Sequence, residues 1–359
     1  MRKVLLISLL ILVLVLGACT PTTPTEEMAA TEEQMEEEQT IAAEDIKIGY
    51  IVKTLGNTFW QTYEQGARAA AADLGVQIDV RDVPTEGDIK GQLDVAMAMV
   101  GQDYDAIVAA SITNTNLIPA IAEANKNNIP WIVVSEAQDE NVLAQNDAYV
   151  TAQVRLSFYE EGVIIGEYVA EQLNGEGQVG IVEGMAGTSA TRDRIQGVMD
   201  VFKDYPDIEV VASQPADWQR ELARDVAGTM LQANPDIDAI IANNDTMALG
   251  VAVAVEQAGK KGEIIVTGDD GTPEAYEAIK NGDLAATVDG VAWQIAYYSV
   301  HAAVKAVVEG AKTLPNYDLK PNLVTIVNVE EVAAQMPKPP EYMFEVNQNI
   351  YLPISGIKE

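Results

Sequence analysis

Residues 183–194, EGMAGTSATRDR, bring glycines, hydroxyl groups and two arginines together in one short segment. Residues of these types at this spacing suit three kinds of chemistry: a loop that binds phosphate, a serine nucleophile with its electrostatic helpers, or one side of a clamp around an uncharged ligand. The rest of the sequence decides among the three.

The sequence lacks the further residues that a phosphate-binding loop or a serine nucleophile would need. A phosphate loop needs the pattern GxxxxGK[ST], which the sequence does not contain. A serine nucleophile needs a base, and the only histidine is His301, whose apolar helical surroundings indicate a structural or surface role. Ser189 is better explained as part of a helix N-cap region, because an apolar helical face begins at Ile195. The amide groups there can bind a ligand oxygen.

The two arginines cannot both face a ligand. At about 100° per residue, Arg192 and Arg194 lie about 200° apart around that helix. Helical periodicity does not choose between them, and we expect the other arginine to pair with one of the 55 acidic side chains. The segment is therefore predicted to be one side of a clamp.

Three other patterns invite an enzymatic interpretation. GEGQVG at residues 175–180 follows a helical stretch and enters a strand, the reverse of the order in a dinucleotide site. The pairs Asp269–Asp270 and Asn244–Asp245 follow strands, where adjacent residues point to opposite faces, so neither pair assembles two catalytic carboxylates or a metal cluster. We expect no catalysis, no cofactor and no metal.

The length of the chain limits its possible architectures, and its net charge limits its possible partners. The 359 residues suit two lobes of ordinary domain size, and the 55 acidic and 22 basic side chains give a formal net charge of -33. Such a charge repels phosphate backbones and anionic lipid. We therefore expect no nucleic acid partner.

The N-terminus predicts export and lipidation. Arg2 and Lys3 precede a short apolar run and then the sequence LGAC, which resembles the lipobox of bacterial lipoproteins and implies lipidation of Cys19; the alternative is an ordinary signal peptide with a chance cysteine. We expect a signal peptide at residues 1–18 and an acidic, disordered tether at 19–45. Cys19 is the only cysteine, so no disulfide can form within the chain. The expected location is extracytoplasmic, with only the lipid anchor in the membrane.

Beyond the tether, short apolar runs alternate with stretches of helical period, which is typical of an α/β fold with parallel sheets. The first helix is expected to start with a capping box of Thr58 and Gln61 and to stop at Gly75. Two series of strands are predicted, at 46–52, 76–82, 105–111 and 129–135, and at 177–183, 208–214, 237–243, 262–268 and 282–288. We interpret them as two doubly wound parallel-sheet lobes facing each other across a cleft.

Ligands of such sheets bind beyond the carboxyl ends of the strands. The residues there are polar, and Trp60 and Trp218 each stand near the start of a helix, which favours a stacking surface over a mere lid on the core. Planar aromatic rings with carboxylates, amides and an arginine suit a polyhydroxyl ring, although an amino acid or a nucleoside can use many of the same groups.

Five segments resemble a known family, the ribose-binding-protein-like (type I) periplasmic sugar-binding proteins of ABC transporters. They are TLGNTFW (54–60), GMAGTSATRDR (184–194), SQPADW (213–218), NNDTMALG (243–250) and GDDGTPEAYEAIKNGDLAAT (268–287). The resemblance implies ligand contacts at Asn57, Phe59, Trp60, Arg194, Trp218, Asn244 and Asp270.

The resemblance also implies a hinge of three crossings and lobes that close on the ligand. We expect an N-terminal lobe of residues 46–155 and 290–320, a C-terminal lobe of 156–289 and 321–336, and a proline-rich tail at 337–359. The sequence NLVTIVNVEEV near the end could return as strands to the C-terminal lobe.

Departures from the family pattern argue against ribose itself. Lys53 replaces a small polar residue, Ser135–Glu136 replaces an Asp-Arg pair, and Gly290 stands where a glutamine contact is expected. Lys53 resembles a lysine of the binders of autoinducer-2 and of some deoxyhexoses, and we expect it to take over the cationic role lost at Glu136. Lys53, Ser135 and Glu136 thus complete the predicted ligand-binding set.

The sequence therefore predicts a monomeric lipoprotein that captures a monosaccharide or polyol and delivers it to an ABC transporter permease. The alternative is a ligand-sensing partner of a membrane sensor, including one for a furanosyl ligand like autoinducer-2. An extracellular enzyme on the same fold is a third possibility, distinguished by turnover of the bound sugar.

Overall fold

The computed structural model describes residues 41–335 and 357–358, all of which belong to one compact unit. The predicted signal peptide, Cys19 and the tether up to residue 40 lie outside the described residues, as does most of the predicted tail. Among the described residues, no helix is long and apolar enough to cross a membrane.

The N-terminal lobe is built on a six-stranded parallel sheet of order β12-β6-β5-β4-β2-β3. Its strands are β2 (Lys47–Ile51), β3 (Gln77–Arg81), β4 (Ala106–Ala110), β5 (Trp131–Val134), β6 (Ala152–Arg155) and β12 (Tyr317–Asp318). Every residue of β4 and β5 is buried, because helices cover both faces of the sheet.

The C-terminal lobe is built on a second six-stranded sheet, of order β13-β11-β10-β9-β7-β8. Its strands are β7 (Glu176–Glu183), β8 (Asp207–Pro215), β9 (Ala239–Ala242), β10 (Ile265–Thr267), β11 (Ala286–Asp289) and β13 (Asn322–Thr325). Only the edge strand β13 runs antiparallel to its neighbour. Each strand of the two predicted series overlaps an observed strand, so the predicted α/β fold of two doubly wound lobes is confirmed.

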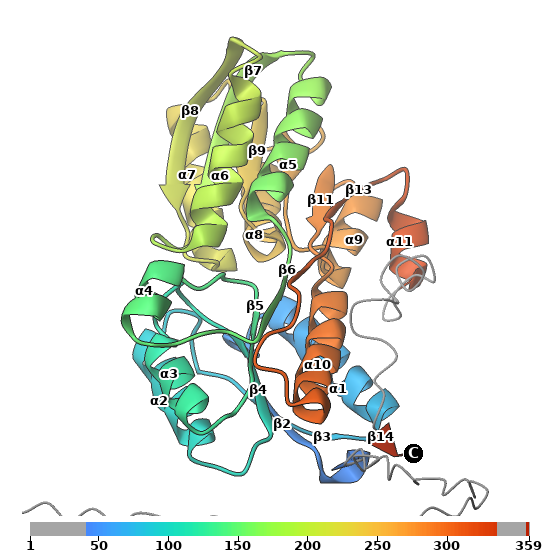
Figure 1. Ribbon diagram of the computed structural model, residues 1–359. Helices are drawn as coiled ribbons and strands as arrows, with labels where there is room; N and C mark the ends of the chain where they lie inside the picture. Colours follow the sequence, from blue (N-terminus) through green and yellow to red (C-terminus); the bar gives the residue numbers. More distant parts are fainter. Residues whose placement is uncertain (1–40, 336–356, 359) are drawn as a thin grey trace, which may run out of the picture. The chain divides into compact units, whose positions relative to one another are not determined.

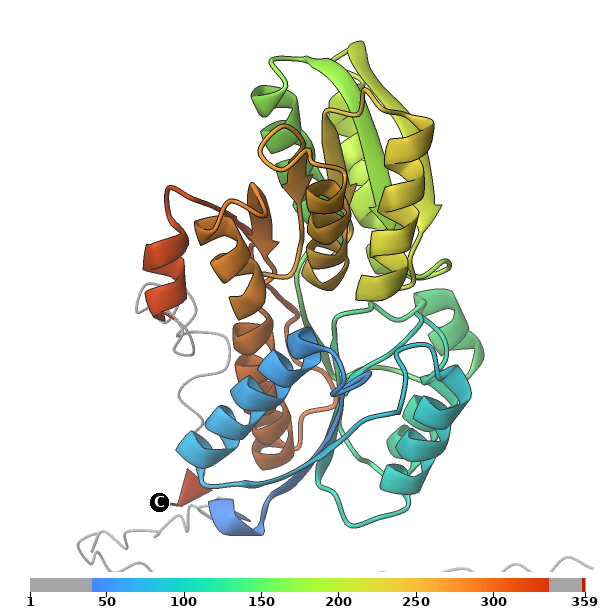
Figure 2. The same cartoon turned by 180° about the vertical axis from the view of Figure 1, so that it is seen from behind.

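Helices sandwich both sheets (Figure 1). They are α1 (Thr58–Leu74), α2 (Ile89–Val100), α3 (Ile118–Lys126), α4 (Glu140–Gln145), α5 (Phe158–Gln172), α6 (Ser189–Phe202), α7 (Arg220–Ala233), α8 (Asp245–Gln257), α9 (Pro273–Lys280), α10 (Ala292–Glu309) and α11 (Val329–Gln335). In the N-terminal lobe, α1 and α10 share one core and α2 and α3 another. Figure 2 shows α1, in blue, beside α10, in orange. In the C-terminal lobe, α5 and α6 cover one face of the sheet and α7, α8 and α9 the other.

The chain passes between the two sheets three times. The crossings lie between β6 and α5, between β11 and α10, and between β12 and β13. At the second crossing, Val291 adopts a left-handed backbone with φ 46°, which is unusual for a β-branched residue. Its amide donates to Asp289 Oδ1 at 2.8 Å, and this bond holds the turn.

Some local predictions were wrong. The capping box of Thr58 and Gln61 does not form, because Asn57 is the N-cap and its Oδ1 accepts a hydrogen bond from Phe59 N at 3.0 Å. Gly75 does end α1, with φ 69°.

The segment after the third crossing returns to the C-terminal lobe only partly as a strand. Asn322–Thr325 form β13, but the chain then continues into helix α11 instead of a further strand.

Secondary structure is present in part of the segment that was predicted to be tether. Residues 41–45, assigned to the tether, form β1 (Ile41–Ala42) and a 3-10 helix (Ala43–Asp45). β1 pairs in parallel with β14 (Ile357–Lys358). The partner strand lies more than three hundred residues away in sequence, so no local pattern announces this pairing.

Candidate ligand-binding site

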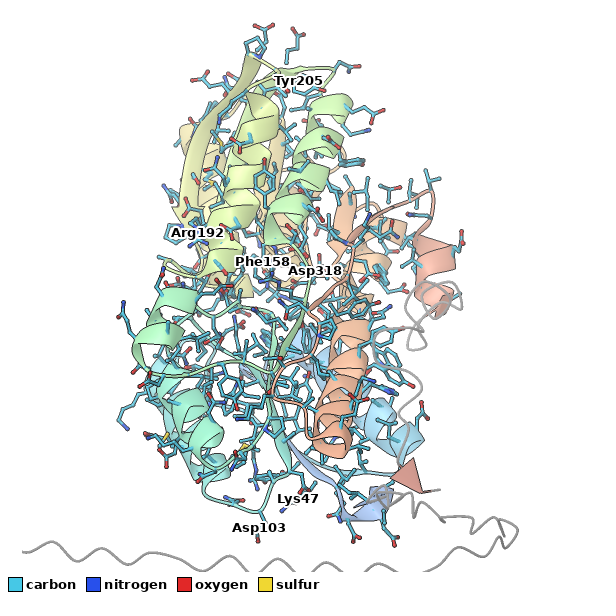
Figure 3. All side chains as sticks on the ribbon, viewed as in Figure 1. Lys47, Asp103, Phe158, Arg192, Tyr205 and Asp318 are labelled. Carbon is cyan, nitrogen blue, oxygen red and sulfur yellow. The ribbon has the colours of Figure 1, made fainter. Side chains whose placement is uncertain are left out.

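A pocket lies between the carboxyl ends of the two sheets, and we call it the central pocket. Its lining residues are Lys53, Asn57, Phe59, Trp60, Glu86 and Ser135 from the N-terminal lobe, and Phe158, Ala190, Arg194, Trp218, Asn244 and Asp270 from the C-terminal lobe. The fold thus brings every predicted ligand-binding residue to one place except Glu136. Figure 3 shows Phe158 at the level where the lobes meet, whereas Tyr205 and Lys47 lie at the far ends of the two lobes.

Glu86 organises the N-terminal side of the central pocket. Its carboxylate accepts hydrogen bonds from Asn57 Nδ2 at 3.2 Å and from Trp60 Nε1 at 2.9 Å. Trp60 also contacts Phe59 edge to face, with ring centroids 4.9 Å apart. Since Trp60 is 2% exposed, it packs into the lobe core as well as lining the pocket. The carboxylate therefore fixes both the aromatic ring and the amide that were predicted from sequence.

Lys53 is a buried cation, 4% exposed, so it is not a solvated lysine beside the hinge. It follows β2, where a parallel sheet presents its carboxyl edge. Its Nζ lies 3.9 Å from Glu136 Oε1 and 5.3 Å from the centroid of the Trp60 ring. Burial of a lysine requires such an ionic partner.

Glu136 does not line the central pocket. Its carboxylate accepts hydrogen bonds from Ser189 N at 3.2 Å, from Ala190 N at 3.3 Å and from the Ser189 hydroxyl. In this structure α6 therefore binds the Glu136 carboxylate, and a contact between Glu136 and the ligand stays a prediction. The amide groups at the start of α6, predicted to bind a ligand oxygen, instead bind this carboxylate.

Arg194 anchors the C-terminal side from the buried face of α6. It donates from Nε to Glu161 Oε2 at 2.8 Å and from Nη1 to the Asn243 carbonyl at 2.7 Å. Its Nη2 lies 3.0 Å from Asp269 Oδ1 and 3.5 Å from Asp270 Oδ1. Each of its three guanidinium nitrogens thus lies within 3.0 Å of an acceptor on that lobe.

Arg192 lies on the opposite side of α6, as the periodicity requires. It is exposed and its Nε contacts Asp193 Oδ1 at 2.8 Å, which confirms the predicted pairing of the second arginine with an acidic residue.

Asp269 and Asp270 were expected to point to opposite faces, and that expectation was wrong, since both contact Arg194. The strand ends at Thr267, and Asp270 has φ 124°, so strand alternation no longer applies to this pair.

Burial controls the protonation of this acidic cluster. It raises the pKa of Glu161, Asp269 and Asp270, and the guanidinium of Arg194 opposes the shift. Burial also raises the pKa of Asp245 to about 7, although hydrogen bonds to its carboxylate oppose this. These groups therefore hold protons at a pH at which exposed carboxyl groups have lost theirs.

Trp218 reaches the pocket because the chain turns sharply before α7. Asp217 and Trp218 have φ 48° and φ 64°, so Trp218 lies in this turn, two residues before α7 begins. A Cβ atom on Gly184 would lie 1.9 Å from Trp218 Cη2. Glycine at 184 is therefore needed to admit the indole ring.

Asn244 and Ser135 take their positions from the ends of strands. Asn244 is the N-cap of α8, and its Oδ1 accepts a hydrogen bond from Met247 N at 2.9 Å. Ser135 follows β5 with φ 65° and is buried.

Sequence reasoning missed Glu86, Phe158, Ala190 and Glu161. Glu86 follows β3 and could have been found by the strand-end rule that gave the other residues. Phe158 starts α5 directly after the first crossing, and the Arg194 guanidinium carbon lies 5.3 Å from its ring centroid. Nothing local in the sequence marks Glu161 as the partner of Arg194.

Within residues 41–335 and 357–358, no group of three or more His, Cys, Asp or Glu side chains is arranged to hold an ion. In the buried acidic cluster, Arg194 supplies the positive charge that the carboxyl groups contact.

Comparison with known proteins gives the family. A model of the periplasmic binding protein domain matches residues 48–312. The D-allose-binding periplasmic protein of Escherichia coli (strain K12) is 39% identical over 239 residues, which are 66% of this chain and 77% of that protein.

Solved structures agree with the match. An ABC transporter periplasmic solute-binding protein of Actinobacillus succinogenes 130z, with bound D-allose, has a TM-score of 0.77 and 29% identity over 80% of this chain and 99% of its own. An ABC transporter solute-binding protein of Bacillus halodurans C-125, with bound myo-inositol, has a TM-score of 0.75 and 29% identity over 82% and 100%. The chain therefore belongs to the periplasmic binding protein family, with the type I fold of the ABC transporter sugar-binding proteins that it resembles.

Proposed function

We propose that the central pocket captures a neutral monosaccharide or cyclic polyol, which the protein delivers to an ABC transporter permease. The observation that carries the proposal is the charge balance of the pocket. Its two lining cations, Lys53 and Arg194, both have carboxylate partners, at 3.9 Å and 3.0 Å. Among the described lining residues, no unpaired cation remains for a ligand carboxylate or phosphate. A neutral ligand is favoured, because a buried charge needs a partner.

The other lining groups suit hydroxyls. Glu86 and Asp270 supply carboxylate oxygens, while Asn57 and Asn244 supply amides that both donate and accept. Each sugar hydroxyl also donates and accepts, so one carboxylate or amide can bind two adjacent hydroxyls. The set therefore matches a ring that carries hydroxyls along its edge.

Aromatic side chains from both lobes match the faces of such a ring. Phe59 and Trp60 lie on the N-terminal side, and Phe158 and Trp218 on the C-terminal side. The CH groups of a sugar ring form apolar faces that pack against aromatic rings. The bound D-allose and myo-inositol of the two solved relatives are neutral polyhydroxyl rings of this kind.

Transport and anchoring complete the proposal. Family membership implies an extracytoplasmic location. Lipidation at Cys19 would hold the protein at the membrane on its acidic tether, and the closed lobes would dock on the permease as a monomer.

A thermal-shift panel tests the ligand class. The chain from Thr20 onward is screened against pentoses, hexoses, deoxyhexoses, polyols, autoinducer-2, nucleosides and amino acids. A ligand at a hundred times its dissociation constant adds roughly 2.7 kcal/mol, or on the order of 5–10 °C. A shift confined to neutral sugars or polyols is expected. Shifts only with nucleosides or amino acids would overturn the sugar assignment.

A further inference from the structure

Glu136 belongs to one lobe and is bound by the other. It follows β5 of the N-terminal lobe, and its side chain is completely buried. Its hydrogen-bond donors, the amides of Ser189 and Ala190 and the Ser189 hydroxyl, all lie at the start of α6 in the C-terminal lobe. The contact therefore exists only while the two lobes are together.

The start of α6 is a favourable place for this carboxylate. The first amides of a helix have no partner within the helix, and the helix dipole attracts negative charge there. The N-cap, Thr188, supplies an acceptor for Thr191 N, at 3.3 Å. Glu136 binds the two amides between them. Lys53 adds a positive charge 3.9 Å from Glu136 Oε1 on the N-terminal side.

This contact is the strongest link between the lobes that the hydrogen bonds reveal. Another runs from Thr246 Oγ1 to Asn57 Oδ1 and is a single, longer bond of 3.4 Å between neutral groups. Hydrogen bonds to an ionised acceptor are stronger than those between neutral groups. Opening the cleft would separate Glu136 from three donors at once.

We propose that Glu136 is a latch between the lobes and also sets the charge of the ligand. This inference rests on the proposed function and deepens it. As a latch, Glu136 stabilises the closed form and so raises ligand affinity without touching the ligand, which makes it a positioning residue. As a built-in anion, it fills the place beside Lys53 and the α6 amides where a ligand carboxylate would otherwise bind.

The surroundings of Glu136 link the two roles. Lys53 and Ala190, which contact its carboxylate, both line the central pocket, as does Ser135, the residue before it in the chain. Shortening Glu136 to alanine would leave Lys53 and the amides of residues 189 and 190 without their anion, next to the pocket. A sugar that carries its own carboxylate could then take the vacated place.

The test compares Glu136→Gln and Glu136→Ala with the wild type and with Glu140→Gln, a change at an exposed glutamate four residues away. Circular dichroism and a melting curve first establish that each variant folds. Calorimetry measures affinity for the neutral ligand found in the panel, and for glucuronate and galacturonate. Small-angle scattering measures the radius of gyration with and without the neutral ligand.

The latch predicts a distinct result for each protein. Glu136→Gln and Glu136→Ala should bind the neutral ligand about tenfold or more weakly, while Glu140→Gln stays within about twofold of the wild type. Without ligand, both Glu136 variants should have a larger radius of gyration than the wild type. Glu136→Ala alone should bind the uronates.

Opposite results separate the inference from the proposed function. Equal affinities and equal radii for wild type and Glu136→Gln would overturn the latch, and failure of Glu136→Ala to bind either uronate would overturn the charge-setting role. If the wild type bound no neutral sugar or polyol, the proposed function would fail. The scattering comparison without ligand would still decide whether Glu136 holds the lobes together.

Discussion

The Nη2 atom of Arg194 lies 3.0 Å from Oδ1 of Asp269, and both side chains are almost completely buried. The same guanidinium binds Glu161 and lies 3.5 Å from Asp270. Arg194 is thus the shared counter-charge of several buried carboxyl groups. Its charge stabilises the fold by pairing with these groups. The same contacts fix the position of the guanidinium at the site.

Replacing Arg194 should therefore unfold the protein more readily as well as weaken binding. Arg194→Ala leaves buried carboxyl groups without their cation, and loss of one partner of a buried pair costs about 3–5 kcal/mol. Arg192→Ala is the matched control, since Arg192 is exposed and pairs only with its neighbour Asp193. Its cost should stay below about 1 kcal/mol. Urea unfolding measures both, and similar costs for the two variants would contradict the network.

Lys53→Ala should weaken ligand binding far more than Lys47→Ala. Lys53 is buried in the central pocket between Glu136 and Trp60. Lys47 is the first residue of β2, the strand that Lys53 follows, and its Nζ lies 4.5 Å from the centroid of the Tyr104 ring, far from the pocket (Figure 3). Removing a buried, paired cation typically costs about 2–5 kcal/mol of binding energy where the pair supports the ligand. Calorimetry with the ligand from the panel compares the two variants, and equal affinities would remove Lys53 from the site.

The strand-end rule explains why much of the site could be predicted. Asn244 and Asp270 each follow a buried strand of the C-terminal lobe, and Asn57 follows the first strand of the N-terminal lobe. Parallel strands end at the same edge of a sheet, so residues distant in sequence are brought together. The alternation of apolar runs and helical periods gave the fold for the same reason, because both are properties of single segments.

The roles that could not be predicted depend on the opposite lobe or on unusual backbone angles. Glu136 looked like a ligand contact, since nothing in its own segment indicates that α6 would supply its donors. Asp269 and Asp270 face the same arginine because Asp270 leaves the extended region at φ 124°. Glu161 is paired with Arg194 by the packing of α5 against α6, which no spacing in the sequence fixes.

Gly184→Ala should displace Trp218 and weaken ligand binding. The added Cβ would lie 1.9 Å from Trp218 Cη2, so the indole ring must move out of its place in the pocket wall. We expect about a tenfold or greater loss of affinity, as overpacking typically costs 1–3 kcal/mol.

Gly228→Ala is the control, because nothing lies within 4 Å of the new methyl group in α7. It should stabilise the protein by about 0.5–1 kcal/mol. Unchanged affinity and unchanged tryptophan fluorescence in Gly184→Ala would contradict this role of the glycine.

His301 should make the protein less stable in acid. Burial lowers its pKa to about 4, although Asp73 opposes the shift, and neither ring nitrogen has a hydrogen-bond partner among the described residues. In the unfolded chain a histidine has a pKa near 6.5, so between these values the unfolded state binds more protons than the folded state. The stability that depends on neutral His301 is complete above pH 6.5 and is lost as the pH falls toward 4.

Comparison with His301→Leu isolates this effect from the titration of the carboxyl groups. Between pH 7.5 and pH 5, the wild type should lose about 2 kcal/mol more of its free energy of unfolding than the variant. The full effect of a pKa difference of about 2.5 is about 3.4 kcal/mol, at 1.36 kcal/mol per pH unit, and it is reached only below pH 4. The aromatic contact between His301 and Tyr297, with ring centroids 4.7 Å apart, is lost in the variant at every pH and so shifts the whole curve without changing its slope. Urea unfolding at several pH values gives both curves. If the two curves ran parallel, His301 would not be titrating as its burial requires.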